Sequence, residues 1–259
     1  MLVRNTSSRC MVVPAEVNNI SASDFVKSVE ELIDGSTGEL SLNCSQLQHV
    51  SSTHVSLLWQ AVSICRRAGL SARLTSVGVG LARVLRILDL YDMFEIEKAC
   101  QPDRERSSQD EGVLAAANGA EFEFQPRANV IKGIASEFRS FLQRLGIAEI
   151  DIFELETIFY EAVTNIRLHG RLCECDKITF KAILDSSVVS MRFFDPGPPF
   201  DPTASRDDYD PEEAIRSKRR RGLGITMIRR MTDELAYERN AALGNILLMK
   251  KRVSFKEDT

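Results

Sequence analysis

The chain has 259 residues, of which 44% are hydrophobic and 27% charged, a composition typical of soluble globular proteins. The formal net charge is −4 at pH 7, which gives no support for general nucleic-acid binding. The sequence contains no run of about 18 apolar residues that could span a membrane, and its N-terminus lacks the apolar run of a signal peptide. These features predict a soluble cytoplasmic protein with one large or two modest domains.

Six cysteines are spread along the chain, at positions 10, 44, 65, 100, 173 and 175. No two of them have the Cys-x-x-Cys spacing of zinc or thioredoxin-like sites. The Cys173/Cys175 pair also lacks a second ligand pair at the distance a zinc site requires. We therefore expect reduced thiols, as is usual in the cytosol.

A polar segment divides the sequence into two parts. Residues 101–111 are almost wholly polar or charged. Such a composition cannot bury enough apolar surface to offset the entropy of ordering, so it predicts a linker over residues 99–119. The linker separates an N-terminal domain, residues 1–98, from a C-terminal domain, residues 120–259.

The N-terminal domain alternates short strands with helices. Residues 10–14, 40–44 and 72–77 have strand character, and Gly69 is placed to end a helix. This order predicts an α/β layer. Apolar side chains at helical spacing mark the inner faces of two helices: Val55, Leu58, Trp59, Val62 and Cys65, then Leu81, Val84, Leu85 and Leu88.

The C-terminal domain has longer amphipathic helices, and its strands follow one another along the chain. Helices segregated from consecutive antiparallel strands predict a two-layer α+β sandwich. The predicted elements are a strand at 121–124, helices at 130–145 and 151–169, strands at 178–184 and 189–193, a helix at 222–232, and strands at 234–239 and 246–252.

Three polar side chains share one face of the helix predicted at 151–169. Glu161, Asn165 and His169 follow one another at intervals of four residues. Asn165 offers a neutral oxygen that can complete the ligand shell of Mg²⁺. Glu161 could orient or deprotonate a nucleophile near a γ-phosphate. The alternative is a solvated polar helix face without a ligand.

Two glycine-containing strings complete the pattern. Asp195-Pro-Gly197 directly follows a strand, where the carboxylate can accept from the amine of adenine and Gly197 permits close approach of the backbone. Taken alone, the string is also a plain proline-rich turn. Gly222, Leu223 and Gly224 open a helix, whose free N–H groups suit a polyphosphate. The Walker sequence of P-loop proteins is absent.

In this order and spacing, the three features resemble the Bergerat-fold ATPases, the family of histidine kinases, gyrase, mismatch-repair and heat-shock chaperone ATPases. The resemblance covers nearly all of residues 120–259 and implies binding of ATP and Mg²⁺. Pro199 departs from it, because many members have a second glycine there. The implied roles are Mg²⁺ binding for Asn165, adenine binding for Asp195 and Gly197, ATP binding for Gly222, Leu223 and Gly224, and a mobile lid for residues 201–221.

Within that family, Glu161–Gly170 and residues 233–251 resemble the small bacterial anti-sigma factor serine kinases. This resemblance implies a serine/threonine protein kinase with Glu161 as its catalytic base, which sequesters a sigma factor or a similar regulator. It also implies a homodimer and a cognate serine phosphatase. A sensor histidine kinase is disfavoured, because none of the histidines lies on a dimerising helical hairpin of the kind that carries the phosphoacceptor.

Residues 40–94 resemble the STAS domain of anti-sigma factor antagonists, which are the substrates of those kinases. The resemblance implies helices packed on a mixed sheet, and it aligns Ser52 with the phosphorylated serine, with Ser51 and Thr53 as less favoured acceptors. Ser51 replaces an Asp of the family and His54 replaces a Gly. His54 could crowd the surface on which a kinase docks. The alternative is that these residues only cap a helix.

Two functions therefore remain open. One is a partner-switching regulator that phosphorylates a STAS antagonist, either its own Ser52 or a separate protein. The other is a non-catalytic, nucleotide-gated binding module whose STAS domain masks the partner surface. Retention of Glu161 and Asn165 favours the kinase, whereas the changes at Ser51 and His54 favour masking. Neither reading includes direct binding to nucleic acid or a membrane.

Overall fold

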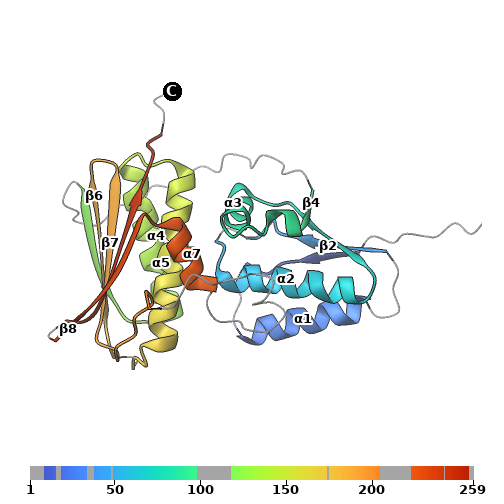
Figure 1. Ribbon diagram of the computed structural model, residues 1–259, viewed down its shortest axis with the longest axis horizontal. Helices are drawn as coiled ribbons and strands as arrows, with labels where there is room; N and C mark the ends of the chain where they lie inside the picture. Colours follow the sequence, from blue (N-terminus) through green and yellow to red (C-terminus); the bar gives the residue numbers. More distant parts are fainter. Residues whose placement is uncertain are drawn as a thin grey trace, which may run out of the picture. The chain divides into compact units, whose positions relative to one another are not determined.

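A computed structural model describes residues 9–15, 19–33, 38–47, 49–97, 118–173, 175–204, 223–241 and 243–256. These residues form two compact units, one on each side of the predicted linker (Figure 1). Most of the predicted linker and of the predicted lid lies outside the described residues. Among the described helices, none has the length and apolarity that a membrane span needs.

The N-terminal unit is built on a parallel sheet with the strand order β1-β2-β3-β4. Every neighbouring pair of its described strands is parallel, so the predicted mixed sheet is wrong for this part of the chain. The reason is that a helix separates each strand from the next and returns the chain to the same end of the sheet. The elements are β1 (Arg9–Val12), α1 (Asn19–Ile33), β2 (Glu39–Asn43), α2 (Ser52–Arg67), β3 (Ser71–Thr75), α3 (Val79–Ile87), η1 (Tyr91–Met93) and β4 (Glu95–Ile96).

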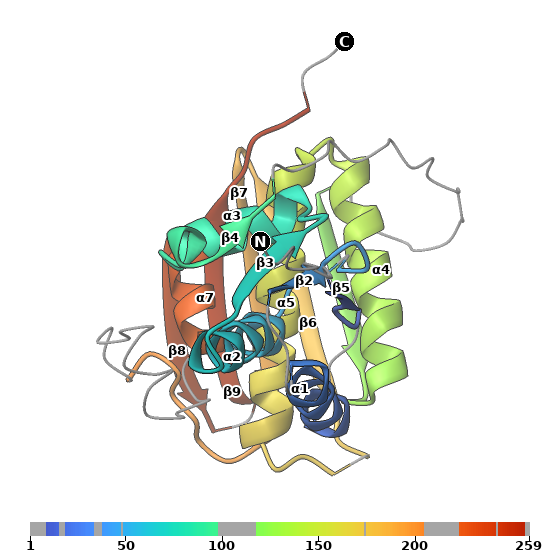
Figure 2. The ribbon, with the colours of Figure 1, turned by 90° about the vertical axis from the view of Figure 1, so that its right-hand side faces the viewer.

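Helix α1 is an element that the sequence analysis did not predict. It packs beside α2 (Figures 1 and 2). Phe25, Val29 and Ile33 recur at four-residue spacing along α1, and all three are buried. The helical signal was therefore present, but it rests on only three buried apolar positions.

Both strands and helices contribute side chains to the core of this unit. Leu42 and Leu74 point inward from neighbouring parallel strands, and Leu58 comes from α2 and Leu85 from α3. All four side chains are fully buried. The predicted inner faces of the two helices are confirmed.

The C-terminal unit is a two-layer sandwich, as predicted. Its antiparallel sheet has the order β5-β6-β7-β9-β8, and the helices cover one face (Figure 1). The elements are β5 (Gly119–Phe124), α4 (Ala128–Arg144), α5 (Glu149–His169), β6 (Ile178–Asp185), β7 (Val188–Asp195), α7 (Leu223–Met231), β8 (Glu234–Asn240) and β9 (Gly244–Arg252).

Aromatic rings fill the space between the helices and the sheet. Phe159 of α5 lies at the centre, with its ring centroid 5.0 Å from Phe180, 5.8 Å from Phe193 and 5.9 Å from Phe138. Tilted and edge-on ring pairs at these distances add to the free energy gained from burial alone. This cluster anchors the central helix on the sheet.

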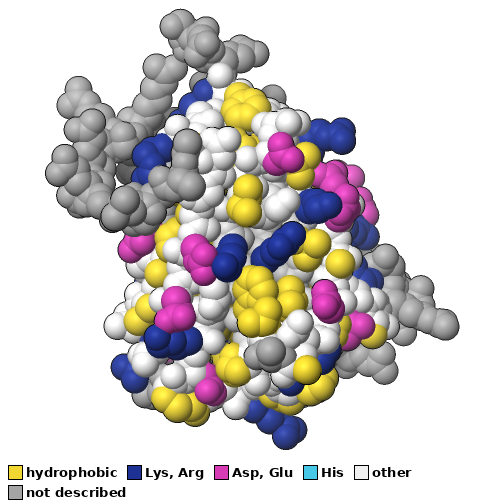
Figure 3. Space-filling model, turned by 90° about the vertical axis from the view of Figure 1, so that its left-hand side faces the viewer, with side chains coloured by type: hydrophobic (Ala, Val, Ile, Leu, Met, Phe, Trp, Pro, Cys, Tyr) yellow, Lys and Arg dark blue, Asp and Glu magenta, His cyan; other side chains and the backbone are white. Residues whose placement is uncertain are grey.

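The opposite face of the sheet carries charged side chains interspersed with apolar ones (Figure 3). Lys181 stands directly across from Glu121 in the β5–β6 ladder, with 3.0 Å between the charged atoms. Lys250 and Glu234 form the same kind of cross-strand pair between β9 and β8, at 2.7 Å. Such exposed pairs contribute little energy each but fit the strand register.

The two cysteines at the start of the α5–β6 loop differ from expectation. Cys173 and Cys175 form a disulfide, with their Cα atoms 5.3 Å apart, so the expectation of reduced thiols is wrong for this pair. A hydrogen bond from the Asp176 N–H to the Cys173 carbonyl closes a turn and brings the two side chains together. Cys10, Cys44 and Cys65 are free.

The aromatic cluster predicts a large difference between two substitutions on the same helix. We expect Phe159→Ala to lower the free energy of unfolding of the C-terminal unit by about 3–5 kcal/mol, because it leaves a cavity among packed rings. Leu168→Ala is the matched control, since Leu168 is 69% exposed, and should change stability by less than about 0.5 kcal/mol.

Guanidinium unfolding followed by circular dichroism measures both variants. Trp59 is the sole tryptophan and lies in the N-terminal unit, so its fluorescence reports that unit separately. Equal losses in the two variants would contradict the role given to the cluster.

Candidate functional site

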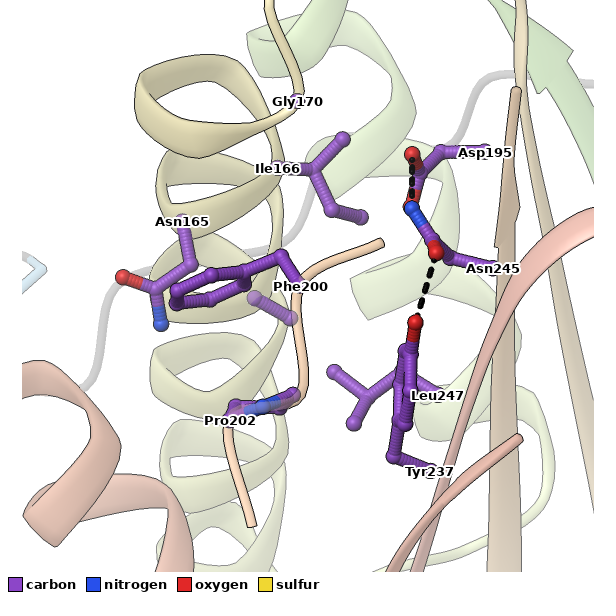
Figure 4. Close-up of a pocket in the computed structure, with 10 residues that line it drawn as sticks. Asn165, Ile166, Gly170, Asp195, Phe200, Pro202, Tyr237, Asn245 and Leu247 are labelled. Carbon is purple, nitrogen blue, oxygen red and sulfur yellow. Dashed lines mark hydrogen bonds between the residues drawn. The ribbon is translucent and has the colours of Figure 1, made fainter. Parts of the chain in front are cut away.

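A pocket lies between α5, the loop after β7, and strands β8 and β9 (Figure 4). Asn165 and Asp195, two residues singled out from the sequence, both line it. Tyr237, Asn245 and Phe200 are among the other lining residues. The fold therefore brings the predicted helix face and the predicted strand end to one place.

Asp195 ends strand β7 and is only 6% exposed. Its Oδ1 accepts hydrogen bonds from the Gly197 N–H at 2.9 Å and from the Asn245 side-chain amide at 2.9 Å. Burial raises the pKa of Asp195, because desolvation disfavours the charged form, while both hydrogen bonds and the charge of Arg239 act in the opposite direction. Among the residues that the structure describes, no donor bonds Oδ2, so this atom can accept from a ligand.

Asn245 holds the carboxylate in place and is itself held from two sides. Its Oδ1 accepts from the Tyr237 hydroxyl at 2.8 Å and from Arg239 Nη1 at 2.9 Å. With its oxygen so occupied, the amide group must turn its Nδ2 towards Asp195. Arg239 Nη1 also donates to the Gly197 carbonyl at 2.7 Å, which ties the loop after β7 to strand β8.

Sequence reasoning missed this network. Asn245 stands opposite Asp195 in the β7–β9 ladder, and only that register brings the two together. The sequence shows that both strands exist, but it does not show which residues face each other across them.

Gly197 is required by the close approach of two backbone segments. A Cβ atom there would lie 2.6 Å from the carbonyl oxygen of Gly170, at the end of α5, and 2.7 Å from Asp195 Oδ1. Any side chain would therefore push the loop away from the helix. From the sequence we expected Gly197 to let the backbone approach adenine, whereas the structure shows it approaching the end of α5.

The polar face of α5 is only partly solvated. Glu161 is 2% exposed, so the alternative of a solvated polar face is wrong at this position. Asn165, one turn later, is half-buried and lines the pocket. His169 is exposed and stacks on the ring of Phe200, with 4.3 Å between ring centroids. Phe200 itself lies beside Asn165 in front of the helix (Figure 4).

The helix predicted to begin at Gly222 is α7, whose first described residue is Leu223. Leu223 is buried and Gly224 follows it inside the helix, whereas Gly222 lies outside the described residues. Arg229 of α7 donates to the carbonyl of Thr203 at 2.9 Å, so α7 holds the segment that follows the pocket loop.

The candidate phosphoacceptor residues lie at the start of α2, as predicted. Ser51 is the N-cap, Ser52 is the first helical residue and Thr53 is exposed. The Ser51 N–H donates to His54 Nδ1 at 3.1 Å, and the His54 N–H donates to Ser51 Oγ at 3.4 Å. This reciprocal pair is a capping box.

The expectation that His54 crowds the docking surface is wrong, because its side chain is only 5% exposed. With Nδ1 accepting, the proton is on Nε2, which lies 3.2 Å from the carbonyl oxygen of Ala15 in the loop after β1. Burial lowers the pKa of His54, because it disfavours the charged imidazolium. The imidazole therefore serves as a neutral internal link.

The Asp195–Asn245 hydrogen bond predicts a stability effect. We expect Asn245→Ala to lower the free energy of unfolding by about 1–3 kcal/mol and to raise the pKa of Asp195 further, because a buried acceptor loses a donor. Chemical denaturation gives the first value, and carboxyl ¹³C shifts during a pH titration give the second. Asn129→Ala, at an exposed position of α4, is the control; equal effects of the two substitutions would contradict the prediction.

Comparisons with known proteins agree with the two units. Residues 2–101 match the family model of the STAS domain, and residues 124–251 match that of the histidine kinase-like ATPase domain. No curated protein matches the chain.

Several solved structures show distant similarity. The RsbU and RsbW domains of Rv1364c from Mycobacterium tuberculosis align at 16% identity over 53% of this chain and 33% of that chain, with a TM-score of 0.38. The SiaB-SiaC complex from Pseudomonas aeruginosa aligns at 16% identity over 52% of this chain and 88% of that one, with a TM-score of 0.40. The Acinetobacter baumannii histidine kinase AdeS aligns at 13% identity over 91% of this chain and 96% of that one, with a TM-score of 0.32.

The match thus spans about a third of the first of these structures. The family models rest on sequence and agree with the folds of the two units. The chain joins a STAS domain to a histidine kinase-like ATPase domain.

Proposed function

We propose that the ATPase-like domain binds ATP with Mg²⁺ in the pocket beside Asp195. The observation that carries this proposal is the buried carboxylate whose Oδ1 is occupied by Gly197 and Asn245. Its remaining oxygen suits the exocyclic amine of adenine, which donates hydrogen bonds and carries no charge.

The phosphate end of the nucleotide would meet α5 and α7. Asn165 on α5 would supply a neutral oxygen to Mg²⁺, which usually keeps waters and bridges phosphate oxygens. The first turn of α7, with Leu223 and Gly224, would offer backbone N–H groups to the phosphates.

We further propose that the domain is a serine/threonine protein kinase acting on a STAS serine. Glu161 lies one helical turn before Asn165, which suits a base that removes the proton of the attacking hydroxyl. The serine oxygen forms a bond to the γ-phosphorus, the bond to the bridging oxygen breaks, and ADP leaves. The product phosphate would sit at the N-terminus of α2, where the helix dipole stabilises negative charge.

The acceptor in this scheme is Ser52 of the same chain or the serine of a separate antagonist. A linker of about 20 residues would keep the two domains at an effective concentration of roughly millimolar. The kinase domain would form a homodimer, although the chemistry does not require one. It would hold a sigma factor or a similar regulator, and a serine phosphatase would reverse the modification.

A second candidate is a non-catalytic module in which nucleotide gates binding and the STAS domain masks the partner surface. The capping box between Ser51 and His54 favours this candidate, because Ser51, which replaces the family's Asp, is engaged in capping the helix. In this reading Ser52 only begins a helix.

Nucleotide binding tests the assignment of the pocket. We expect Asp195→Asn to weaken ATP binding by at least about tenfold, because an amide replaces the charged acceptor. Asn165→Ala should remove the gain in affinity that Mg²⁺ gives and leave binding in the presence of a chelator unchanged. Isothermal titration calorimetry measures both, with Asn129→Ala as the control. Unaltered affinity in Asp195→Asn would refute the adenine assignment.

Phosphate transfer separates the two candidate functions. We expect Mg·ATP to place one phosphate on Ser52, located by peptide mass mapping, and Ser52→Ala to abolish it. Glu161→Gln should slow the transfer by about 10²- to 10⁴-fold while ATP still binds. Thr53→Ala is the matched control and should be phosphorylated normally. ATP binding without any phosphate on the wild-type chain would favour the gated binding module.

A further inference from the structure

The loop between α5 and β6 holds a cluster of possible metal ligands that the nucleotide site does not use. Cys173, Cys175 and Asp176 each place one ligand atom within 4.8 Å of the others. Both cysteines are exposed and Asp176 is half-buried, so an ion could reach all three from solvent. The cluster belongs entirely to the ATPase-like domain.

We propose that this loop, with its two cysteines reduced, is a binding site for Zn²⁺. The ligands are the Cys173 and Cys175 thiolates and one carboxylate oxygen of Asp176. Two thiolates select a soft or borderline ion, and the carboxylate disfavours Cu⁺, which leaves Zn²⁺ as the best match. The fourth tetrahedral position is open to water.

The backbone of the loop is already arranged for these ligands. The Asp176 N–H donates to the Cys173 carbonyl at 3.1 Å, and the Cys173 N–H donates to Asp176 Oδ2 at 2.7 Å. The first bond closes the turn, and the second orients the carboxylate and leaves Oδ1 for a metal. Sulfur atoms on a tetrahedral Zn²⁺ lie about 3.8 Å apart for Zn–S bonds of about 2.3 Å, a separation that small side-chain rotations would give once the disulfide opens.

The disulfide must be reduced before the two cysteines can bind a metal. A phosphine reductant and one water convert the disulfide to two thiols and a phosphine oxide, which accounts for both electrons and both protons. Zn²⁺ then displaces the two thiol protons as it binds. The oxidised loop has no thiolate to offer, so the two states of the cysteine pair exclude each other.

Co²⁺ serves as the probe, because thiolate ligands give it a charge-transfer absorption that oxygen ligands do not. We expect the phosphine-reduced full chain, without a histidine tag, to bind one Co²⁺ with this absorption and to release it when Zn²⁺ is added. Any Co²⁺ in the proposed nucleotide site would bind through oxygen and lack this absorption. The absorption therefore tests the Zn²⁺ site independently of the proposed nucleotide site.

Matched variants complete the test. Cys175→Ser should abolish the absorption, whereas Cys10→Ser, at an exposed free cysteine of the other unit, should leave it intact. Asp176→Asn preserves an acceptor for the Cys173 N–H and should weaken Zn²⁺ binding by about tenfold or more. Circular dichroism checks that each variant is folded. Absence of the absorption in the reduced wild type, its survival in Cys175→Ser, or equal binding by the oxidised chain would overturn the proposal.

Discussion

A carboxylate that is buried at the end of a strand needs hydrogen-bond partners, because burying it without them costs several kcal/mol of folding free energy, about 2–7 kcal/mol for a polar group. Asp195 meets this requirement through Gly197 and Asn245, and the rest of the pocket follows from it. Asn245 needs partners for its own oxygen, which Tyr237 and Arg239 supply from β8. The edge hairpin and the pocket loop are therefore joined by polar contacts.

The same constraint extends to helix α5. The loop after β7 passes close to the end of α5 where it meets the Asp195 carboxylate, and this passage leaves no room for a side chain at Gly197. The aromatic cluster around Phe159 fixes the helix on the sheet, so the position of Asn165 relative to Asp195 is set by packing. A preformed arrangement of this kind lowers the entropy cost of binding a ligand.

Much of this fold could be predicted from the sequence, because its elements have strong periodicity. The helices beginning near Ala128 and Glu149 and the strands β6, β7 and β9 follow apolar patterns that their burial confirms. Helix α1 escaped because only three apolar positions, Phe25, Val29 and Ile33, define its inner face. The direction of the N-terminal strands depends on their connections, and the helix between each strand and the next makes every described pair parallel, unlike the mixed sheet that the resemblance implied.

The candidate site was predictable only in part. Asp195 and Asn165 lie in recognisable strings, and the structure places both in one pocket. Asn245, Tyr237 and Arg239 depend on strand register, which a single sequence does not encode in local patterns. The Cys173–Cys175 disulfide likewise depends on a turn whose hydrogen bonds leave no pattern in the residue types.

The buried link from His54 to the carbonyl of Ala15 makes the start of α2 sensitive to acid. Its imidazole has a lowered pKa in the folded chain, so the unfolded chain takes up a proton first as the pH falls below about 6.5. Folding stability is then lost progressively until the pH reaches the folded pKa. A protonated Nδ1 could no longer accept from the Ser51 N–H, and the loop after β1 would separate from the helix that carries Ser52. Protonation of one buried imidazole would thus weaken the contact between this loop and α2.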